Sequence, residues 1–223
     1  MVFNKEVLFI HIGKTGGTSA AKFLCSTLHG PVYNVVPQGA QDIKYGHETN
    51  LVGQRHAILE EALSFTKKHS NLGLDDFKKI IAVIRNPYNL EISLFNYYKR
   101  LIENNPAVLD GAPKRKKIIL QDDFAAFVQG KFYHRNGIHI KKYISLDRKI
   151  PKKVEVIKFE SMTDRFIELG EEFGNGNSDF PHLNKTKPVD IKDFVTKDLE
   201  IIIYRKYKWV FKVGNYSRLY SGK

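Results

Sequence analysis

Short apolar runs alternate with longer stretches of helical spacing along this chain of 223 residues. Val7–Ile12, Ile80–Ile84 and Val154–Phe159 are nearly continuous runs rich in Val, Ile and Phe, as expected of strands that are covered on both faces. Apolar residues recur at helical spacing in Thr18–Leu28, Ala57–Lys68, Tyr88–Glu103, Asp122–Gln129, Met162–Phe173 and Thr196–Tyr207. Strands that alternate with helices predict an α/β fold with a central, mostly parallel sheet, and the pattern leaves the strand order open.

The segments between these elements predict surface loops and one domain. Asn104–Lys117 contains two prolines, a glycine and the basic run Lys114–Lys117, and Gly174–Asp179 is rich in Gly, Asn and Ser. We interpret the basic run as solvated, with contact to an anionic molecule as the alternative. In the last helix, the sequence YRKYKWVF is expected to pack its aromatic faces inward and its Lys and Arg residues outward. The length suits one hydrophobic core, so residues 1–223 are expected to form a single domain.

The charge balance favours an anionic ligand. The chain has 36 Lys and Arg residues against 24 Asp and Glu residues, which gives a net charge of +12. Such a surface attracts nucleotides, acidic sugars, nucleic acid or acidic lipid. Cys25 is the only cysteine and cannot form an internal disulfide, and no signal-peptide pattern follows Met1, so we expect a cytoplasmic protein. No apolar run approaches the roughly 20 residues of a membrane span, so any membrane contact is expected to be peripheral.

The first candidate site follows the first predicted strand, in the sequence Gly13-Lys14-Thr15-Gly16-Gly17-Thr18-Ser19. Its glycines allow backbone N–H groups to turn toward a ligand, and the helix that follows adds its N-terminal amides, an arrangement that binds phosphate. The patterns G-x-x-x-x-G-K-[ST] and G-x-G-x-x-G are both absent, since Lys14 precedes the glycines. The alternative is a strand-to-helix turn in which Gly and Thr serve only geometry and capping.

The second candidate site is Arg85, which ends the predicted strand Ile80–Ile84 and precedes a helix. Asn86 is expected to cap this helix and Pro87 to occupy its first position. Triphosphatases usually have an Asp at the end of this strand to organise Mg²⁺, whereas Arg binds anions. Arg85 and Ser93 therefore predict a second anionic group on the same ligand. The alternative is that Arg85 pairs with a carboxylate and Ser93 lies on the helix surface.

The sequences HIGKTGGTS and AVIRNPYNLEISLFNYY together resemble the sulfotransferases that use 3′-phosphoadenosine 5′-phosphosulfate, especially the carbohydrate sulfotransferases and their bacterial relatives. The resemblance implies a P-loop-like, three-layer α/β/α fold and a cytoplasmic bacterial enzyme that needs no metal. It also implies that Arg85 and Ser93 bind the 3′-phosphate. The residues that it assigns to the 5′-phosphosulfate are Lys14, Thr15, Gly16, Gly17, Thr18 and Ser19.

The resemblance extends more weakly to VIKFESM at 156–162 and PHLNKTK at 181–187, where it implies cofactor contacts for Lys185 and Thr186. The chain has Gly13 where the family often has Pro, and Asn89-Leu90 where the family often has Asp-Arg. Neither difference affects a residue expected to bind the ligand.

Sulfuryl transfer also needs a group that stabilises the leaving phosphate and a base that takes the proton of the acceptor. Lys14 is our candidate for the first role. His56 resembles the histidine that family members carry ahead of the Arg strand, and His47 is the second candidate base. Glu48 or Glu60 are further candidates, and His11, within the first predicted strand, is expected to be a packed core residue.

Three function classes stay open at this point. A sulfotransferase predicts metal-independent binding of 3′-phosphoadenosine 5′-phosphate and an acceptor hydroxyl or amine, with a carbohydrate or glycoconjugate as the leading expectation. A small-molecule kinase predicts Mg²⁺-dependent binding of ATP, and a nucleic-acid-binding module predicts salt-sensitive binding of DNA or RNA. The position of Lys14 and the presence of Arg85 disfavour the kinase. Positive charge that is spread along the chain disfavours the nucleic-acid module. The oligomeric state is open.

Overall fold

The structure is a computed structural model that describes residues 1–130, 139–181, 183 and 189–220. Its internal contacts divide the chain into two compact units. Unit 1 comprises Met1–Ile84 and Ile140–Lys185, and unit 2 comprises Arg85–His139 and Thr186–Lys223. Each unit is described separately, and the single domain over residues 1–223 stays a prediction.

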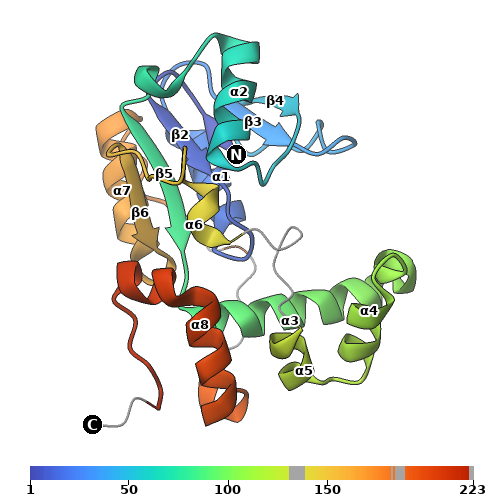
Figure 1. The fold of residues 1–223 in the computed structure, drawn as a ribbon. Helices are drawn as coiled ribbons and strands as arrows, with labels where there is room; N and C mark the ends of the chain where they lie inside the picture. Colours follow the sequence, from blue (N-terminus) through green and yellow to red (C-terminus); the bar gives the residue numbers. More distant parts are fainter. Residues whose placement is uncertain (131–138, 182, 184–188, 221–223) are drawn as a thin grey trace. The chain divides into compact units, whose positions relative to one another are not determined.

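Unit 1 contains a mixed, mostly parallel sheet of six strands (Figure 1). The strands are β1 (Val2–Phe3), β2 (Val7–Ile10), β3 (Tyr33–Val36), β4 (Thr49–Val52), β5 (Lys79–Ile84) and β6 (Val154–Lys158). Their order across the sheet is β4-β3-β1-β2-β5-β6. The two-residue strand β1 runs antiparallel to both of its neighbours, and the other pairs are parallel. Five strands therefore point in one direction and bring their carboxyl ends to the same edge.

Helices cover both faces of this sheet. The helices of unit 1 are α1 (Gly17–Thr27), α2 (Leu59–Ser70), α6 (Ile140–Tyr143) and α7 (Met162–Phe173), with short 3₁₀ turns η1 (Leu74–Asp76) and η3 (Phe159–Ser161). Phe9 and Ile81 share one apolar core with Phe23 of α1 and Phe166 of α7, so α1 and α7 cover the same face. Alternate residues of a strand point to opposite faces of a sheet, and Val35 of β3 points to the face opposite α1 and α7. On that face, Val35 and Phe65 of α2 both lie close to Gly53. The arrangement is compatible with a three-layer α/β/α fold.

Unit 2 is helical. Its helices are α3 (Pro87–Asn104), α4 (Pro113–Leu120), α5 (Phe124–Gln129) and α8 (Lys197–Gly214), with 3₁₀ turns η2 (Pro106–Leu109) and η4 (Ile191–Asp193). Phe95 of α3 packs against Phe124 and Phe127 of α5, with ring centroids 5.4 and 5.3 Å away. Tyr88 of α3 packs edge-on against Phe211 of α8 at 5.3 Å. Aromatic pairs thus hold α5 and α8 against α3.

The predicted α/β class and mostly parallel sheet are confirmed, and the predicted helix Met162–Phe173 has its observed bounds. Strands β3 and β4 were not predicted, because each has four residues and carries Asn on one face. Asn34 and Asn50 are register partners, and the Asn34 Nδ2 donates to Asn50 Oδ1 at 3.2 Å. This side-chain hydrogen bond links β3 to β4.

Three expectations for unit 2 are corrected. The basic run Lys114–Lys117 lies in helix α4, not in a loop, because Pro113 occupies the first helical position, where proline is tolerated. The last helix extends to Gly214, well beyond the predicted end at Tyr207. Tyr207 itself has non-helical backbone angles (φ −118°, ψ 22°), so the helix continues across a kink. Lys206 is buried rather than turned outward, because it pairs with a buried carboxylate.

Candidate functional site

The carboxyl ends of β2 and β5 lie next to each other at one edge of the sheet of unit 1. After β2 the chain passes through α1 to β3, on one side of β2, whereas β5 lies on the other side. The strand order therefore reverses between β2 and β5. In open α/β sheets, ligands bind outside the carboxyl ends of the strands at such a point. The loop that follows β2 is the one singled out from the sequence.

This loop has an unusual backbone. Lys14 and Gly16 have left-handed conformations, with φ of 65° and 80°, and Thr15 between them does not. Asn and Asp predominate among the described non-glycine residues with positive φ, and Lys14 is one of two with a long side chain. Alternating left- and right-handed residues turn successive N–H groups toward a common point and form an anion-binding concavity. Strained backbone of this kind recurs at ligand sites.

The side chains of the loop have mixed roles. Thr15 is fully buried, and its Oγ1 donates to the Ile12 carbonyl at 2.9 Å, so this hydroxyl stabilises the turn. Ser19 is buried, and its Oγ accepts a hydrogen bond from the Leu183 N–H at 3.0 Å. Lys14 and Thr18 are partly exposed. The backbone amides, Lys14 and Thr18 are therefore the groups best placed to contact a ligand.

Each of the two glycines also has a packing reason. A Cβ added at Gly17 would lie 1.9 Å from Cδ2 of His11, and one added at Gly16 would lie 2.7 to 2.9 Å from Met162 and Phe159. Gly16 also needs its left-handed backbone. The His11 ring, expected to be packed, is indeed buried and lies against α1 at Gly17.

His56 lies beside the same strand end. Its Nδ1 is 2.8 Å from the His11 carbonyl oxygen, and the two imidazole rings have centroids 4.4 Å apart. Because a carbonyl oxygen can only accept, Nδ1 carries the proton, which makes Nε2 the basic nitrogen of the neutral ring. His56 is half-buried. The structure thus brings His56 together with the segment that leads into the loop Gly13–Ser19.

His47 and Glu48 lie at the opposite end of α1. The His47 Nε2 is 3.0 Å from the Leu28 carbonyl oxygen, beyond the C-terminus of α1, and the helix is about 16 Å long. The two carboxylate oxygens of Glu48 each accept a backbone N–H, from Tyr45 and Gly46, at 2.7 Å. Glu60 is exposed in the first turn of α2. Their placement favours His56 over these three residues as the base.

The predicted 3′-phosphate residues belong to unit 2. Arg85 follows the last residue of β5 in the chain and is partly exposed. Asn86 caps α3 as expected, since its side chain accepts from Tyr88 N at 3.0 Å, and Pro87 takes the first helical position. Ser93 lies about 9 Å further along the α3 axis, half-buried. Lys185 and Thr186 lie outside the described residues.

No protein-family model matches the chain, and neither the curated proteins nor the solved structures include a significant match to it. What the candidate site binds is therefore inferred from the residues and the geometry of this chain alone.

Proposed function

We propose that the protein is a sulfotransferase with a P-loop-like fold that transfers a sulfuryl group from 3′-phosphoadenosine 5′-phosphosulfate to an acceptor hydroxyl or amine. The observation that carries this proposal is the loop after β2, where a half-buried lysine and a glycine both have left-handed backbone at the start of α1. This geometry suits an anhydride of phosphate and sulfate, with backbone amides on the oxygens and Lys14 near the bridging oxygen. Arg85 is proposed to bind the 3′-phosphate with Ser93.

The residues have complementary roles in this reaction. The acceptor oxygen attacks sulfur in line, a new O–S bond forms, and the S–O bond to the 5′-phosphate breaks. Lys14 and the loop amides stabilise the charge that develops on the departing phosphate. His56 takes the acceptor proton at Nε2, because its Nδ1 already donates to the His11 carbonyl.

Calorimetric titration tests the donor site. The purified protein is titrated with 3′-phosphoadenosine 5′-phosphate and, separately, with ATP, each with and without Mg²⁺. We expect metal-independent binding of the first nucleotide. Binding of ATP that requires Mg²⁺, without binding of the first nucleotide, would indicate a kinase and overturn the proposal.

Arg85→Ala tests the second anion site. We expect its affinity for 3′-phosphoadenosine 5′-phosphate to fall about 10- to 100-fold, the loss typical of hydrogen bonds to a charged group. Affinity for adenosine 5′-phosphate should stay nearly constant. Arg100→Ala is the matched control, because it removes the same charge from an exposed position of α3. Equal losses for both nucleotides would make Arg85 a structural residue.

A carbohydrate or glycoconjugate hydroxyl is the proposed acceptor, from the resemblance to the carbohydrate-type enzymes. With an acceptor identified by screening, His56→Ala should retain nucleotide binding and lose about 100-fold or more in kcat. His47→Ala should keep its kcat, since His47 lies at the far end of α1. Full activity of His56→Ala would assign the proton transfer to another group.

A further inference from the structure

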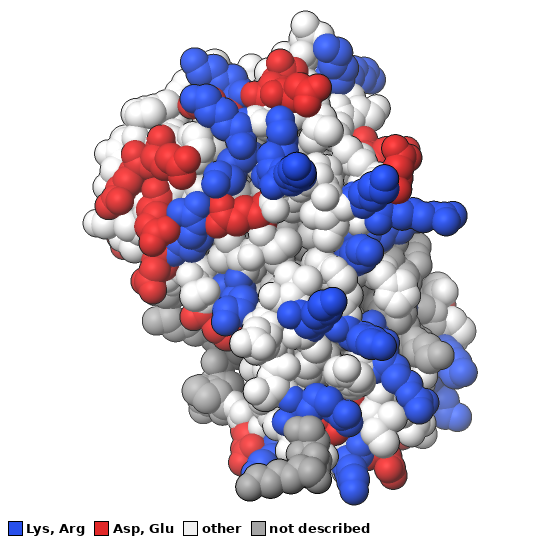
Figure 2. Space-filling view, turned by 60° about the vertical axis from the view of Figure 1, so that its left-hand side comes forward, with Lys and Arg blue, Asp and Glu red and all other residues white. Residues whose placement is uncertain are grey.

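The positive charge of the protein is concentrated in unit 2. This unit has 18 Lys and Arg residues against 9 Asp and Glu residues, which leaves +9, whereas unit 1 has 18 against 15, which leaves +3. The sequence suggested that the charge is spread along the chain, but the units are interleaved in sequence, which hides the asymmetry. Lys and Arg side chains are scattered over the whole face in Figure 2, whereas Asp and Glu gather chiefly at its upper left.

Helix α8 presents four basic residues to solvent. Lys197, Arg205, Lys208 and Lys212 are all exposed. Because the helix is kinked at Tyr207, they form two pairs, with Lys197 and Arg205 before the kink and Lys208 and Lys212, about one helical turn apart, after it. The ion pairs of unit 2 in the described residues involve other cations: Lys99, Lys116, Lys206 and Arg218. Asp198 is the one acidic residue on the exposed side of α8, whose residues are all described. Among the residues that the structure describes, no carboxylate therefore forms an ion pair with the four exposed cations of α8.

Apolar side chains lie beside these cations. After the kink, Trp209 and Val213 lie about one helical turn apart and next in sequence to Lys208 and Lys212, and Ile202 lies before the kink. Val213 is 44% exposed, and Ile202 and Trp209 are partly exposed. These residues are distinct from the buried face of α8, which includes Leu199 and Ile203. The segment of α8 after the kink thus combines two cations, Lys208 and Lys212, with an apolar ledge, Trp209 and Val213, that contains an indole.

We propose that this face of α8 binds the surface of an anionic lipid bilayer. Lys and Arg next to a negatively charged leaflet are attracted to its headgroups, and side chains such as Trp, Ile and Val enter the boundary between headgroups and acyl chains. Trp favours that boundary because its ring is apolar and its N–H is polar. In the described residues no helix is long and apolar enough to cross a bilayer, so the contact is peripheral. The proposal does not depend on the sulfotransferase activity.

The apolar ledge favours lipid over nucleic acid. Proteins that bind single strands combine basic grooves with several aromatic platforms for successive bases. On the segment of α8 after the kink, the ledge has a single aromatic ring, Trp209, and its other member, Val213, offers no ring on which a second base could stack. Aliphatic side chains instead gain stability when acyl chains cover them.

Trp209 supplies a direct readout, because it is the only tryptophan in the chain. The protein is mixed with vesicles of equal parts phosphatidylcholine and phosphatidylglycerol, and with vesicles of phosphatidylcholine alone. With the anionic vesicles we expect cosedimentation and a shift of the Trp209 emission to shorter wavelength. About 1 M salt should reverse most of the binding, because the screening length falls to about 3 Å.

The variant Lys208→Gln/Lys212→Gln tests the two exposed lysines that follow the kink in α8. Each basic residue near an anionic surface contributes about five-fold to binding, so two substitutions should weaken it roughly 25-fold. Lys67→Gln/Lys68→Gln, in exposed positions of α2, is the matched control and should bind like the parent protein. Val213→Ser tests the ledge and should weaken binding several-fold while the salt dependence stays the same.

Three results would overturn the proposal. The first is the absence of binding to the anionic vesicles. The second is equal binding by the α8 and α2 double variants, which would place the contact elsewhere on the surface. The third is binding without any change in Trp209 emission, which would separate α8 from the bilayer. A single-stranded oligonucleotide that shifts the emission when the vesicles do not would assign the face to nucleic acid instead.

Discussion

In unit 1 the Glu155 carboxylate lies near the surface and binds Arg165 and Lys79, whereas in unit 2 the Glu91 carboxylate is fully buried and binds Lys206. The core of unit 1 is built from apolar residues of the sheet, α1 and α7. The described core of unit 2 encloses charged groups between its helices. Unit 1 also buries a carboxylate, Glu48, but two backbone N–H groups bind it. The buried carboxylates of unit 2, Glu91 and Glu200 on the long helices α3 and α8, instead bind the cationic side chains of Lys206 and Arg218.

The Glu91 site shows how such a partner set is arranged. The Lys206 Nζ lies 2.6 Å from Glu91 Oε1, and the Tyr207 hydroxyl donates to the same oxygen at 2.5 Å. Burial raises the pKa of Glu91 and lowers the pKa of Lys206, because both lose water that would stabilise their charges. Tyr207 reaches Glu91 from the kinked position in α8. The kink in α8 thus lies at Tyr207, the residue that donates to Glu91.

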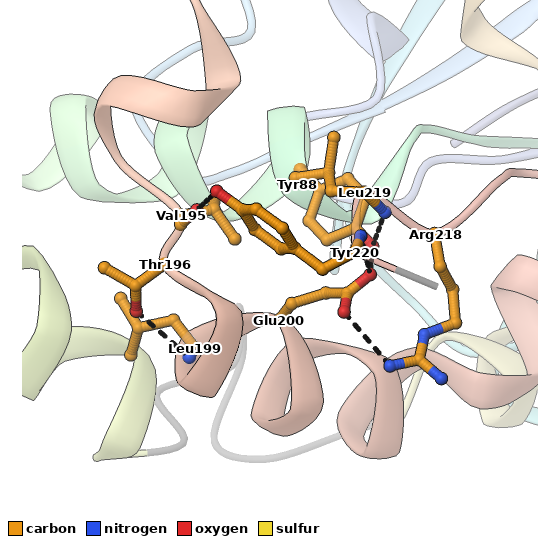
Figure 3. Close-up of polar contacts among 8 residues, drawn as sticks. All are labelled: Tyr88, Val195, Thr196, Leu199, Glu200, Arg218, Leu219 and Tyr220. Carbon is orange, nitrogen blue, oxygen red and sulfur yellow. Dashed lines mark hydrogen bonds and ion pairs between the residues drawn. The ribbon is translucent and has the colours of Figure 1, made fainter. Parts of the chain in front are cut away.

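A second buried carboxylate of unit 2 holds the segment after α8 (Figure 3). The Glu200 Oε1 accepts from the Tyr88 hydroxyl at 3.0 Å and from the Tyr220 N–H at 3.1 Å, and Oε2 accepts from Arg218 at 3.0 Å. Burial alone would raise the pKa of Glu200, but these hydrogen bonds bring it below its usual value. The Tyr220 hydroxyl donates to the Val195 carbonyl at 2.9 Å. One carboxylate therefore ties Arg218 and Tyr220 to α3 and to the start of α8.

The largest expected effect comes from breaking the buried pair of unit 2. Glu91→Leu leaves Lys206 buried without its counter-ion, with Arg115 as a further nearby cation. We expect the free energy of unfolding to fall by about 3 to 5 kcal/mol, as measured by urea denaturation at neutral pH.

The double variant Glu91→Leu/Lys206→Met is the control for this prediction. It removes both charges and should recover most of the stability, with about 1 kcal/mol still lost because the Tyr207 hydroxyl has lost its acceptor. A double variant as unstable as Glu91→Leu would show that the side-chain shapes, not the charges, determine the effect.

A smaller loss of stability is expected in unit 1, from a substitution that disturbs close packing and leaves the charges unchanged. In Gly17→Ala the new Cβ meets the His11 ring, so we expect a loss of about 1 to 3 kcal/mol in thermal unfolding without ligand. Gly111→Ala in unit 2 is the matched control, because no atom lies within 4 Å of its added Cβ. Unchanged stability of Gly17→Ala in the absence of ligand would mean that the glycine serves ligand approach rather than packing.

Predictions from the sequence are most accurate where residues close together in the chain determine the local structure. Asn86 and Pro87 mark the start of α3, and continuous Val and Ile mark β5, so both were predicted to within a residue. Lys206 was expected to point outward, since nothing local distinguishes it from Arg205 or Lys208. Its burial depends on Glu91, which lies on another helix and far away in the sequence.

The same limit applies to the candidate site. The glycines and Lys14 of the loop are visible in the sequence, but the contact between His11 and Gly17 and the tautomer of His56 depend on strand-end geometry. The sequence made His56 the first candidate base and His47 the second, on the resemblance alone. The structure separates them, because His47 follows the C-terminal end of α1.

The smallest effect concerns the surface charges of unit 1. Hydrogen bonds from Arg165 hold the pKa of Glu155 below its usual value of about 4.3, and Lys79 contributes to the same shift. A lowered carboxyl pKa stabilises the fold above the unfolded pKa, and this stability is lost as the pH falls through the folded pKa. Glu155→Gln should therefore lose about 1 kcal/mol at pH 7 and show a flatter decline in stability below about pH 4.

Glu171→Gln, at an exposed position of α7, is the matched control and should keep the parent pH profile. The measurement is urea denaturation across the acid range. If stability depended on pH in Glu155→Gln as it does in the parent protein, water would stabilise the charges of Arg165 and Lys79 as well as the carboxylate does. The charges of unit 1 would then be as dispensable for stability as exposed ion pairs usually are, and the contrast with the buried pair of unit 2 would be sharper.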